Sequence, residues 1–312
     1  KILPILRKLI KFDAVLTGNL SYVEQQELAR VCEARKTPFI VLHKEGLSAG
    51  IYKDSAELYK YYKFIGARML VYNDKVVGVL LGTNPLAGLS EDKVKVVGVP
   101  RLDYYFGDKK SSTNKQIVFF SFYPKYRLSK VFTQEFKLRE AEKRADDFHK
   151  WIMNFAKNHP DFKVTIKTKV AEYYLDYVLD LYKNNFKEKI NNLIITNSAS
   201  SAELIKNSAV VVGYGSMALI ESIIAGKAII SAYFGDLASS ERWDYFDDYP
   251  ELINYIKTEE ELEDRILNYN KYLGYDPKKR EEFLKIFISM PDGRASARAE
   301  EAIIETIKKY QC

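Results

Sequence analysis

Short apolar segments alternate with longer amphipathic segments along most of this sequence. The segments PFIVLH (38–43) and AVVV (209–212) lack a polar alternation, which is typical of strands buried on both faces. The segment 133–158 repeats apolar residues every three to four positions, which predicts a helix. Strands and helices that alternate in this way form parallel sheets with helices on both faces. The sequence therefore predicts an α/β fold.

The same patterns place the expected elements along the chain. We expect strands at 12–17, 38–43, 67–72, 94–99, 116–122, 162–167, 193–196, 209–212 and 227–232. We expect helices at 21–36, 54–63, 133–158, 173–188, 202–206, 217–225, 259–273, 277–288 and 295–310, and the end of another helix at 3–11.

The length of 312 residues exceeds one ordinary hydrophobic core, so two domains are expected. The polar segment GDKKSSTN (107–114) separates two series of strands and helices and is interpreted as the linker. We therefore predict one Rossmann-like domain over 1–110 and a second over 111–312 that includes the carboxyl-terminal helices.

Composition excludes several classes of protein. Hydrophobic residues make up 47% and charged residues 29%, which excludes wholesale disorder and fibrous repeats. No apolar run approaches the roughly 20 residues that cross a bilayer. Two cysteines cannot build a disulfide framework, which favours a reducing, cytoplasmic compartment. Three scattered histidines and two distant cysteines offer no metal cluster, so no metal cofactor is expected.

The net charge is mildly positive. The 48 basic and 42 acidic side chains are interspersed and give +6. Such a potential favours phosphorylated ligands or an anionic membrane surface, so peripheral association with the inner membrane face is compatible with it. The sequence has no helix-turn-helix, RNA-binding or zinc-finger pattern, and we expect no nucleic-acid partner.

The segment VVGYGSMALIE (211–221) is the strongest candidate for a ligand site. A strand runs into Gly213-Tyr214-Gly215-Ser216 and a helix starts at once. Glycines let a ligand approach the backbone, and the helix start presents free N–H groups, which suits a phosphate. Ser216 is placed to cap the helix, and Glu221, in an otherwise apolar helix, suits two ribose hydroxyls. The alternative is a plain tight turn, with Glu221 paired to a lysine.

Other polar residues follow strands of the second domain, where open α/β sheets bind ligands. Lys167 and Lys169 end one strand and are candidates for phosphate charge, or else ordinary solvated lysines. Ser200 and Ser201 follow the strand at 193–196. Ser201 is expected to cap the next helix and Ser200 to reach a base or phosphate.

Candidates for catalysis lie in the first domain. Glu45 follows a buried strand and is a candidate base or acid on the acceptor side, tuned by Lys44 or His43. Asp103 is a candidate nucleophile beside Arg101, or the two form a structural pair. Arg298 near the last helix either reaches the donor or pairs with Glu301 or Glu305.

Several stretches together resemble the GT-B glycosyltransferases of bacterial surface-carbohydrate biosynthesis. They are VVGVPRLDYYF (ending at residue 106), HPDFKVTIKTK (159–169), VVGYGSMALIESIIAGKAII (211–230) and PDGRASARAEEAI (291–303). The resemblance spans about residues 12–310, and within the group it extends to the CMP-Kdo-dependent β-Kdo transferases.

The resemblance implies two Rossmann-like domains that face an interdomain cleft. The first, with only four expected strands before residue 107, would be an incomplete acceptor-side domain, and the second would hold the nucleotide-sugar donor at Tyr214, Gly215, Ser216 and Glu221. It implies metal-independent, retaining transfer of Kdo to a lipopolysaccharide, capsule or other glycan or lipid-linked glycan acceptor.

Three alternatives remain open from the sequence. CDP-glycerol-type polyol-phosphate transferases and UDP-sugar 2-epimerases share the same general layout. A regulatory domain that keeps the fold without turnover is the non-enzymatic alternative.

Overall fold

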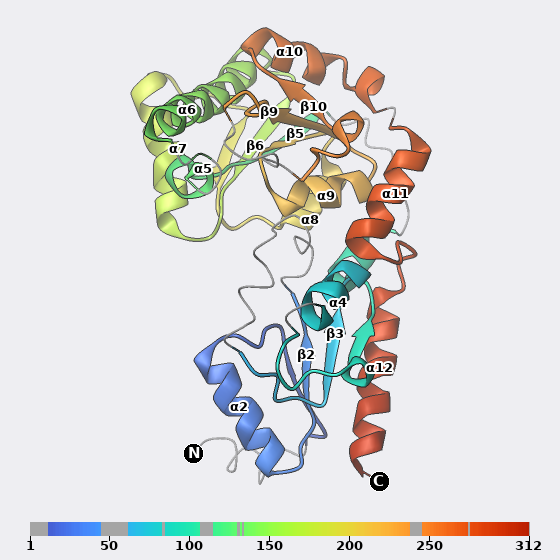
Figure 1. The fold of residues 1–312 in the computed structure, drawn as a ribbon. Helices are drawn as coiled ribbons and strands as arrows, with labels where there is room; N and C mark the ends of the chain where they lie inside the picture. Colours follow the sequence, from blue (N-terminus) through green and yellow to red (C-terminus); the bar gives the residue numbers. More distant parts are fainter. Residues whose placement is uncertain are drawn as a thin grey trace. The chain divides into compact units, whose positions relative to one another are not determined.

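The computed structural model describes residues 12–44, 62–82, 85–106, 115–129, 132, 134–237, 245–273 and 275–311. The chain forms two compact units, shown in Figure 1. Unit 1 comprises Lys1–Gly107 together with Glu282–Cys312, and unit 2 comprises Asp108–Glu281. The expected helix at 54–63 and the linker at 107–114 fall largely or wholly outside the described residues, as does Glu45.

The described part of unit 1 contains a parallel sheet with the strand order β1-β2-β3-β4. Its strands are β1 (Val15–Thr17), β2 (Phe39–Leu42), β3 (Arg68–Val71) and β4 (Val94–Val96). All four lie within the strands expected from the sequence. The observed strands are shorter than expected because only the residues that pair with a neighbouring strand form the ladder of hydrogen bonds.

Helices cover both faces of this sheet. The helices α2 (Val23–Ala34) and α4 (Asp74–Leu81) share one apolar cluster with Val41 and Met69. On the other face, α12 (Ala295–Gln311) packs Ala299 and Ala302 against Ile40 and Leu70. The sequence assigned α12 to the second domain. The structure groups α12 with unit 1 because its small apolar residues are buried on this sheet.

Asp103 lies in the 3₁₀ segment Pro100–Tyr105 and caps the start of α12. The backbone N–H groups of Ala295 and Ser296 donate to its two carboxylate oxygens, at 3.0 and 2.6 Å. The first N–H groups of a helix have no partner within the helix, so a carboxylate there stabilises it. Both oxygens of Asp103 are used in this way, which does not support the predicted role as a nucleophile.

Replacing Asp103 with alanine is expected to destabilise the start of α12 by about 1–2 kcal/mol, because two backbone N–H groups lose their acceptor. Asp103→Asn keeps an oxygen acceptor and is expected to retain most of that stability. Hydrogen exchange of the α12 amides measures the effect. Glu300→Ala, at an exposed position of the same helix, is the control. Equal exchange in Asp103→Ala and wild type would contradict the capping role.

Unit 2 is built on a six-stranded parallel sheet with the order β10-β9-β8-β5-β6-β7. The strands are β5 (Gln116–Phe120), β6 (Lys163–Lys167), β7 (Leu193–Thr196), β8 (Val210–Gly213), β9 (Ala228–Ala232) and β10 (Asn254–Ile256). Numbered from β5 along the chain, the spatial order is 3-2-1-4-5-6, which is the order of the Rossmann fold. The prediction of an α/β, Rossmann-like second domain is confirmed.

The helices of unit 2 lie on both faces of the sheet. Their bounds are α5 (Pro124–Leu128), α6 (Glu135–Asn158), α7 (Glu172–Asn185), α8 (Ser201–Asn207), α9 (Met217–Ile224), α10 (Glu259–Leu267) and α11 (Pro277–Ile288), which runs into unit 1. The helices α6, α7 and α10 share one buried cluster with Phe119 and Ile166, whereas α8 contacts β5 and α9 contacts β8 and β9. The elements α4, α5 and β10 were not expected from the sequence.

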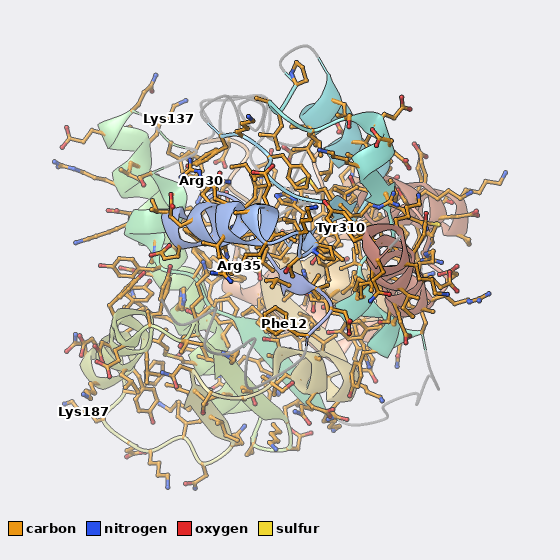
Figure 2. All side chains as sticks on the ribbon, turned by 90° about the horizontal axis from the view of Figure 1, so that it is seen from below. Phe12, Arg30, Arg35, Lys137, Lys187 and Tyr310 are labelled. Carbon is orange, nitrogen blue, oxygen red and sulfur yellow. The ribbon has the colours of Figure 1, made fainter. Side chains whose placement is uncertain are left out.

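The exterior carries many charged side chains. Charged side chains point outward, as Arg30 and Arg35 around the end of α2 and Lys187 after α7 illustrate (Figure 2). Among the described helices, none is both long and apolar enough to cross a bilayer.

Candidate functional site

Three neighbouring strands of unit 2 end at one point. In the sheet register, Phe120 of β5 pairs with Lys167 of β6 on one side and with Gly213 of β8 on the other. After β5, the next strands β6 and β7 are added on one side of it, whereas β8, β9 and β10 are added on its other side. The strand order therefore reverses between β5 and β8. Open α/β sheets bind ligands outside the carboxyl ends of the strands at such a reversal.

A cavity of about 510 Å³ opens at this point of unit 2. Its volume lies in the usual range for small-molecule sites. The residues that line it come from the ends of β5, β6 and β8, from the segments and helices that follow β6, β7 and β8, and from a loop further along the chain: Phe120, Ser121, Phe122, Tyr123, Lys167, Thr168, Lys169, Val170, Tyr174, Ser201, Tyr214, Gly215, Ser216, Met217, Ala218, Glu221 and Tyr245. The sequence-predicted residues Lys167, Lys169, Ser201, Tyr214, Gly215, Ser216 and Glu221 therefore share one cavity.

Two glycines shape the loop between β8 and α9. A Cβ on Gly213 would lie 3.3 Å from Leu219 Cδ2 and 3.4 Å from the Phe120 carbonyl oxygen, so only glycine packs there without a shift. Gly215 has φ +53°, in the left-handed region that favours glycine. The loop therefore turns sharply and leaves its backbone open to the cavity.

The helix α9 begins at this cavity. The Ser216 hydroxyl accepts a hydrogen bond from the Ala218 N–H at 3.3 Å, so Ser216 is the N-cap, as expected from the sequence. At the other end Gly226, with φ +67°, closes a Schellman motif, in which the Lys227 N–H donates to the Ser222 carbonyl at 3.0 Å. Glu221 is half-buried and lines the cavity about one turn from the helix start. The site thus combines a helix N-terminus with a carboxylate.

Two lysines bring positive charge to the cavity, in different ways. The Lys167 ammonium is largely buried and donates to the carbonyl oxygens of Thr168 and Asn197 at 2.6 and 2.8 Å. Burial lowers the pKa of Lys167 below its usual value. An ammonium has three donors, and these two contacts use two of them. Lys169 is exposed, and its Nζ lies 5.3 Å from the centre of the Tyr174 ring.

Three predictions about individual residues change. The Tyr214 ring is 1% exposed and packs against Phe122 and Phe234, with ring centres 5.3 and 4.6 Å apart, so this side chain belongs to the core beneath the site loop. Ser200, rather than Ser201, caps α8, because its hydroxyl accepts from the Glu203 N–H at 3.4 Å. Ser201 is the residue that lines the cavity.

The candidates of the first domain lie in unit 1. Arg101 donates to the Tyr72 hydroxyl at 3.4 Å. Arg298 donates to the Val97 carbonyl and to Asp292, at 3.0 and 2.7 Å. These contacts stabilise the start of α12. Arg298 therefore has a structural role, with Asp292 as its partner in place of the expected Glu301 or Glu305. Lys44 is exposed directly after β2.

Sequence reasoning missed Ser121, Thr168, Tyr174 and Tyr245 as cavity residues. Ser121 follows β5 directly, but the expected strand ran to residue 122 and so included it. Thr168 was passed over between two lysines. Tyr245 comes from a loop far along the chain, and no local pattern in the sequence indicates it.

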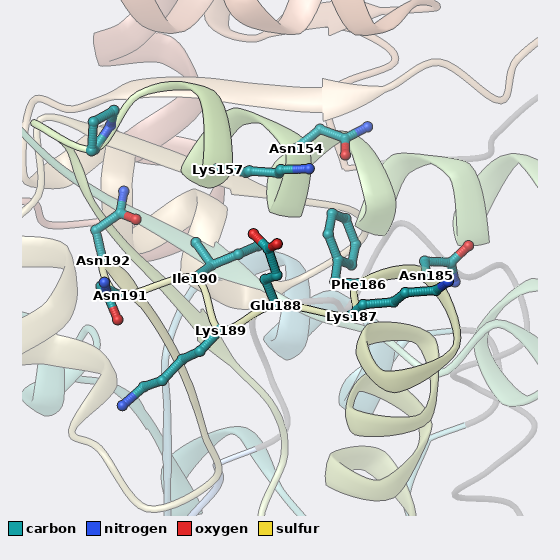
Figure 3. A pocket seen from close by; sticks show the side chains of 11 residues that line it. Asn154, Lys157, Asn185, Phe186, Lys187, Glu188, Lys189, Ile190, Asn191 and Asn192 are labelled. Carbon is teal, nitrogen blue, oxygen red and sulfur yellow. The ribbon is translucent and has the colours of Figure 1, made fainter.

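A second cavity of unit 2, of about 540 Å³, lies elsewhere (Figure 3). It is formed by the end of α6 and the segment 185–192, with Lys157, Lys187 and Lys189 around it. Both β6 and β7 begin just after its lining residues Pro160 and Asn192, so this cavity lies at the amino ends of the strands. It is therefore separate from the site at the carboxyl ends.

Among the described residues, no group of three or more histidine, cysteine, aspartate or glutamate side chains is placed to hold a metal ion.

The structure is similar to several solved structures, all at low sequence identity. The UDP-GlcNAc 2-epimerase from Neisseria meningitidis bound to UDP-GlcNAc is 13% identical with a TM-score of 0.56, over 97% of this chain and 79% of that one. A putative UDP-N-acetylglucosamine 2-epimerase from Listeria monocytogenes is 11% identical with a TM-score of 0.58, over 99% and 78%. The wall teichoic acid polymerase TagF is 15% identical in its H548A form, with a TM-score of 0.58 over 88% and 69%. No protein-family model and no curated protein matches the sequence.

These similarities establish the fold. The chain has the two parallel-sheet α/β units of GT-B enzymes, with the site of unit 2 at the reversal of strand order. The expectation of a GT-B fold is therefore confirmed.

Proposed function

We propose that this chain is a GT-B glycosyltransferase that binds a nucleotide-activated sugar in the cavity of unit 2. The observation that carries the proposal is the cavity itself, in which the glycine loop, the start of α9, Lys167 and Glu221 meet at the reversal of strand order. An epimerase of the same fold has UDP-GlcNAc bound, which supports a nucleotide sugar as the ligand.

Each part of the ligand has a partner in this proposal. The phosphate lies at the start of α9, where the helix dipole favours an anion. Glu221, one turn along the helix, accepts hydrogen bonds from the ribose hydroxyls. Lys167 and Lys169 offset the charge of the departing phosphate.

Because these lysines and the helix supply the positive charge, we propose that transfer needs no metal ion. Activity is then expected to persist in excess EDTA, measured as release of the free nucleotide. Loss of activity that returns with added Mg²⁺ or Mn²⁺ would contradict this.

The donor that we favour is CMP-Kdo, transferred with retention to a bacterial surface polysaccharide or lipopolysaccharide. This finer proposal is supported by the sequence resemblance to the CMP-Kdo-dependent β-Kdo transferases. A thermal-shift screen against CMP, CDP, UDP and GDP tests it. Selective stabilisation by CMP would support Kdo, and selective stabilisation by UDP would contradict it.

Removing the hydroxyl of Ser216 or the negative charge of Glu221 is expected to weaken binding of the nucleotide. Ser216→Ala and Glu221→Gln should each lower the affinity for the nucleotide about 10- to 100-fold, because hydrogen bonds that involve charged groups are lost. Isothermal titration calorimetry with the nucleotide from the screen measures the change.

The control separates ligand binding from helix capping. Thr258 caps α10 through the Glu261 N–H at 3.2 Å and does not line the cavity, so Thr258→Ala should leave the affinity unchanged. Wild-type affinity in both cavity variants would refute the proposed site.

A UDP-sugar 2-epimerase is the second candidate, favoured by the two epimerase structures that align over almost all of this chain. An epimerase converts its nucleotide sugar with no acceptor present. Incubation with UDP-GlcNAc alone, followed by NMR of the products, therefore distinguishes it from a transferase.

The similarity to TagF keeps a CDP-glycerol-type polyol-phosphate transferase as a further alternative. Such an enzyme would leave phosphorus in the glycan product, which phosphorus NMR detects. A sugar transfer would not.

A further inference from the structure

A serine and a fully buried histidine form a hydrogen-bonded pair in the wall of the site cavity. Ser121 directly follows β5 and lines the cavity, and its backbone N–H donates to the Lys167 carbonyl at 3.0 Å. His149 lies on α6 and has no exposed surface. Its Nε2 is 2.8 Å from Ser121 Oγ, and its Nδ1 is 2.7 Å from the Ala145 carbonyl oxygen.

These contacts determine where the protons lie. A carbonyl oxygen only accepts hydrogen bonds, so His149 Nδ1 carries a proton and donates to Ala145. Burial lowers the pKa of His149 to about 4, so the ring is neutral near pH 7 and has a single proton. His149 Nε2 is then bare, and the Ser121 hydroxyl must donate to it.

The surroundings hold the ring in this orientation. The rings of Phe119, Phe122 and Tyr177 lie 4.7, 5.4 and 5.2 Å from the His149 ring, measured between centres. The Tyr177 hydroxyl donates to Asp146 Oδ1 at 2.6 Å, so this neighbouring proton is already used. The pair therefore has one stable arrangement.

The consequence concerns what Ser121 offers to a ligand. A serine hydroxyl has one proton, and here it points to His149, so only lone pairs remain for the cavity. The esterified phosphates of a nucleotide sugar are fully ionised at neutral pH and have no proton to donate to them, whereas an alcohol hydroxyl does. The cavity thus has donor groups at the start of α9 and an acceptor at Ser121.

We propose that Ser121 is a specificity-determining residue that accepts a hydrogen bond from an alcohol hydroxyl of the ligand, and that His149 is the positioning residue that fixes this polarity. The hydroxyl belongs either to the ribose or to the transferred sugar. This inference rests on the proposed function, because it presumes a nucleotide sugar in the cavity.

Calorimetry on the full chain with a set of related ligands tests the inference. The probes are UDP, 2′-deoxy-UDP, 3′-deoxy-UDP, UDP-GlcNAc and inorganic pyrophosphate, with the matching cytidine compounds if CMP binds more tightly. Ser121→Ala is expected to weaken the ligand that carries the contacted hydroxyl about three- to tenfold, as for one neutral hydrogen bond. Pyrophosphate affinity should not change. Ser121→Thr, which keeps a hydroxyl, is the matched control.

The pattern of losses identifies the hydroxyl. If it is on the ribose, one deoxy analogue binds Ser121→Ala and wild type equally. If it is on the transferred sugar, the loss occurs with UDP-GlcNAc and not with UDP. An equal loss for pyrophosphate, or an equal loss for every ligand, would overturn the inference.

A second variant tests His149 itself. In His149→Phe the Ser121 proton is released, Ser121 becomes able to donate, and the affinity difference between the hydroxylated ligand and its deoxy analogue is expected to shrink. A full difference in this variant would show that His149 does not set the polarity.

If wild type binds none of these nucleotides, the proposed function fails and this inference with it. If wild type binds and Ser121→Ala has no effect on any ligand, only this inference fails.

Discussion

Truncating Tyr214 to alanine is expected to lower the free energy of unfolding of unit 2 by about 3–5 kcal/mol, the range for removing a buried aromatic ring. The ring is among the largest fully buried side chains and packs against Phe122 and Phe234 directly beneath the site loop. Its removal leaves a cavity that neighbouring side chains fill only in part. The loop between β8 and α9 is expected to lose its shape, so ligand affinity should fall with the stability.

Urea unfolding followed by tryptophan fluorescence measures this effect. Both tryptophans of the chain, Trp151 and Trp243, fall within the sequence range of unit 2, so we expect the signal to report on this unit. Tyr214→Phe keeps the ring and loses only the hydroxyl, so it is expected to cost about 0.5–1.5 kcal/mol, the net value of one hydrogen bond. If Tyr214→Ala unfolds at the same urea concentration as wild type but loses ligand affinity, the ring acts on the ligand and the assignment to the core is wrong.

The stability of unit 2 is expected to fall as the pH is lowered from about 6.5 towards 4, because of His149. In the folded chain burial lowers the pKa of this residue from 6.5 to about 4, so the folded state keeps the ring neutral over this range. The unfolded chain binds a proton at His149 below pH 6.5, and this difference in bound protons favours unfolding. The complete loss corresponds to about 3 kcal/mol; none of it has occurred above pH 6.5, and it is reached near pH 4.

The measurement is the urea midpoint of unit 2 between pH 7.5 and 4, again by tryptophan fluorescence. Carboxylates titrate in the lower part of this range, so the comparison that isolates His149 is with His149→Phe. The variant should lose less stability than wild type between pH 6.5 and 5. Parallel curves for the two proteins would contradict the prediction. Tyr177, the ring beside His149, does not titrate here because burial and Asp146 raise its pKa.

Much of the fold could be predicted from the sequence because its signals are local. The strand β7 has the expected bounds, and α9 is capped by Ser216 and closed by Gly226 as expected, since apolar runs and capping residues act within one turn of the chain. The elements that were missed are short. The strand β10 has three residues and is stabilised by its pairing with β9, a contact that no local pattern contains.

The candidate site was predictable to the extent that it depends on position after a strand. The residues at and after the strand ends Lys167 and Gly213 could be predicted as site residues, because parallel strands bring their carboxyl ends together. The roles of single side chains were not predictable in this way. Asp103 and Ala295 are far apart in sequence, and only packing brings the carboxylate to the start of α12.

The sequence by itself thus determined the alternation of strands and helices, the parallel sheets and the glycine loop before α9, because each depends on neighbouring residues. Only the tertiary structure decided that the Tyr214 ring is core, that α12 belongs to unit 1 and that His149 directs the Ser121 proton. The physical reason is that burial and hydrogen-bond direction depend on groups distant in the chain, which meet only when the sheets and helices pack.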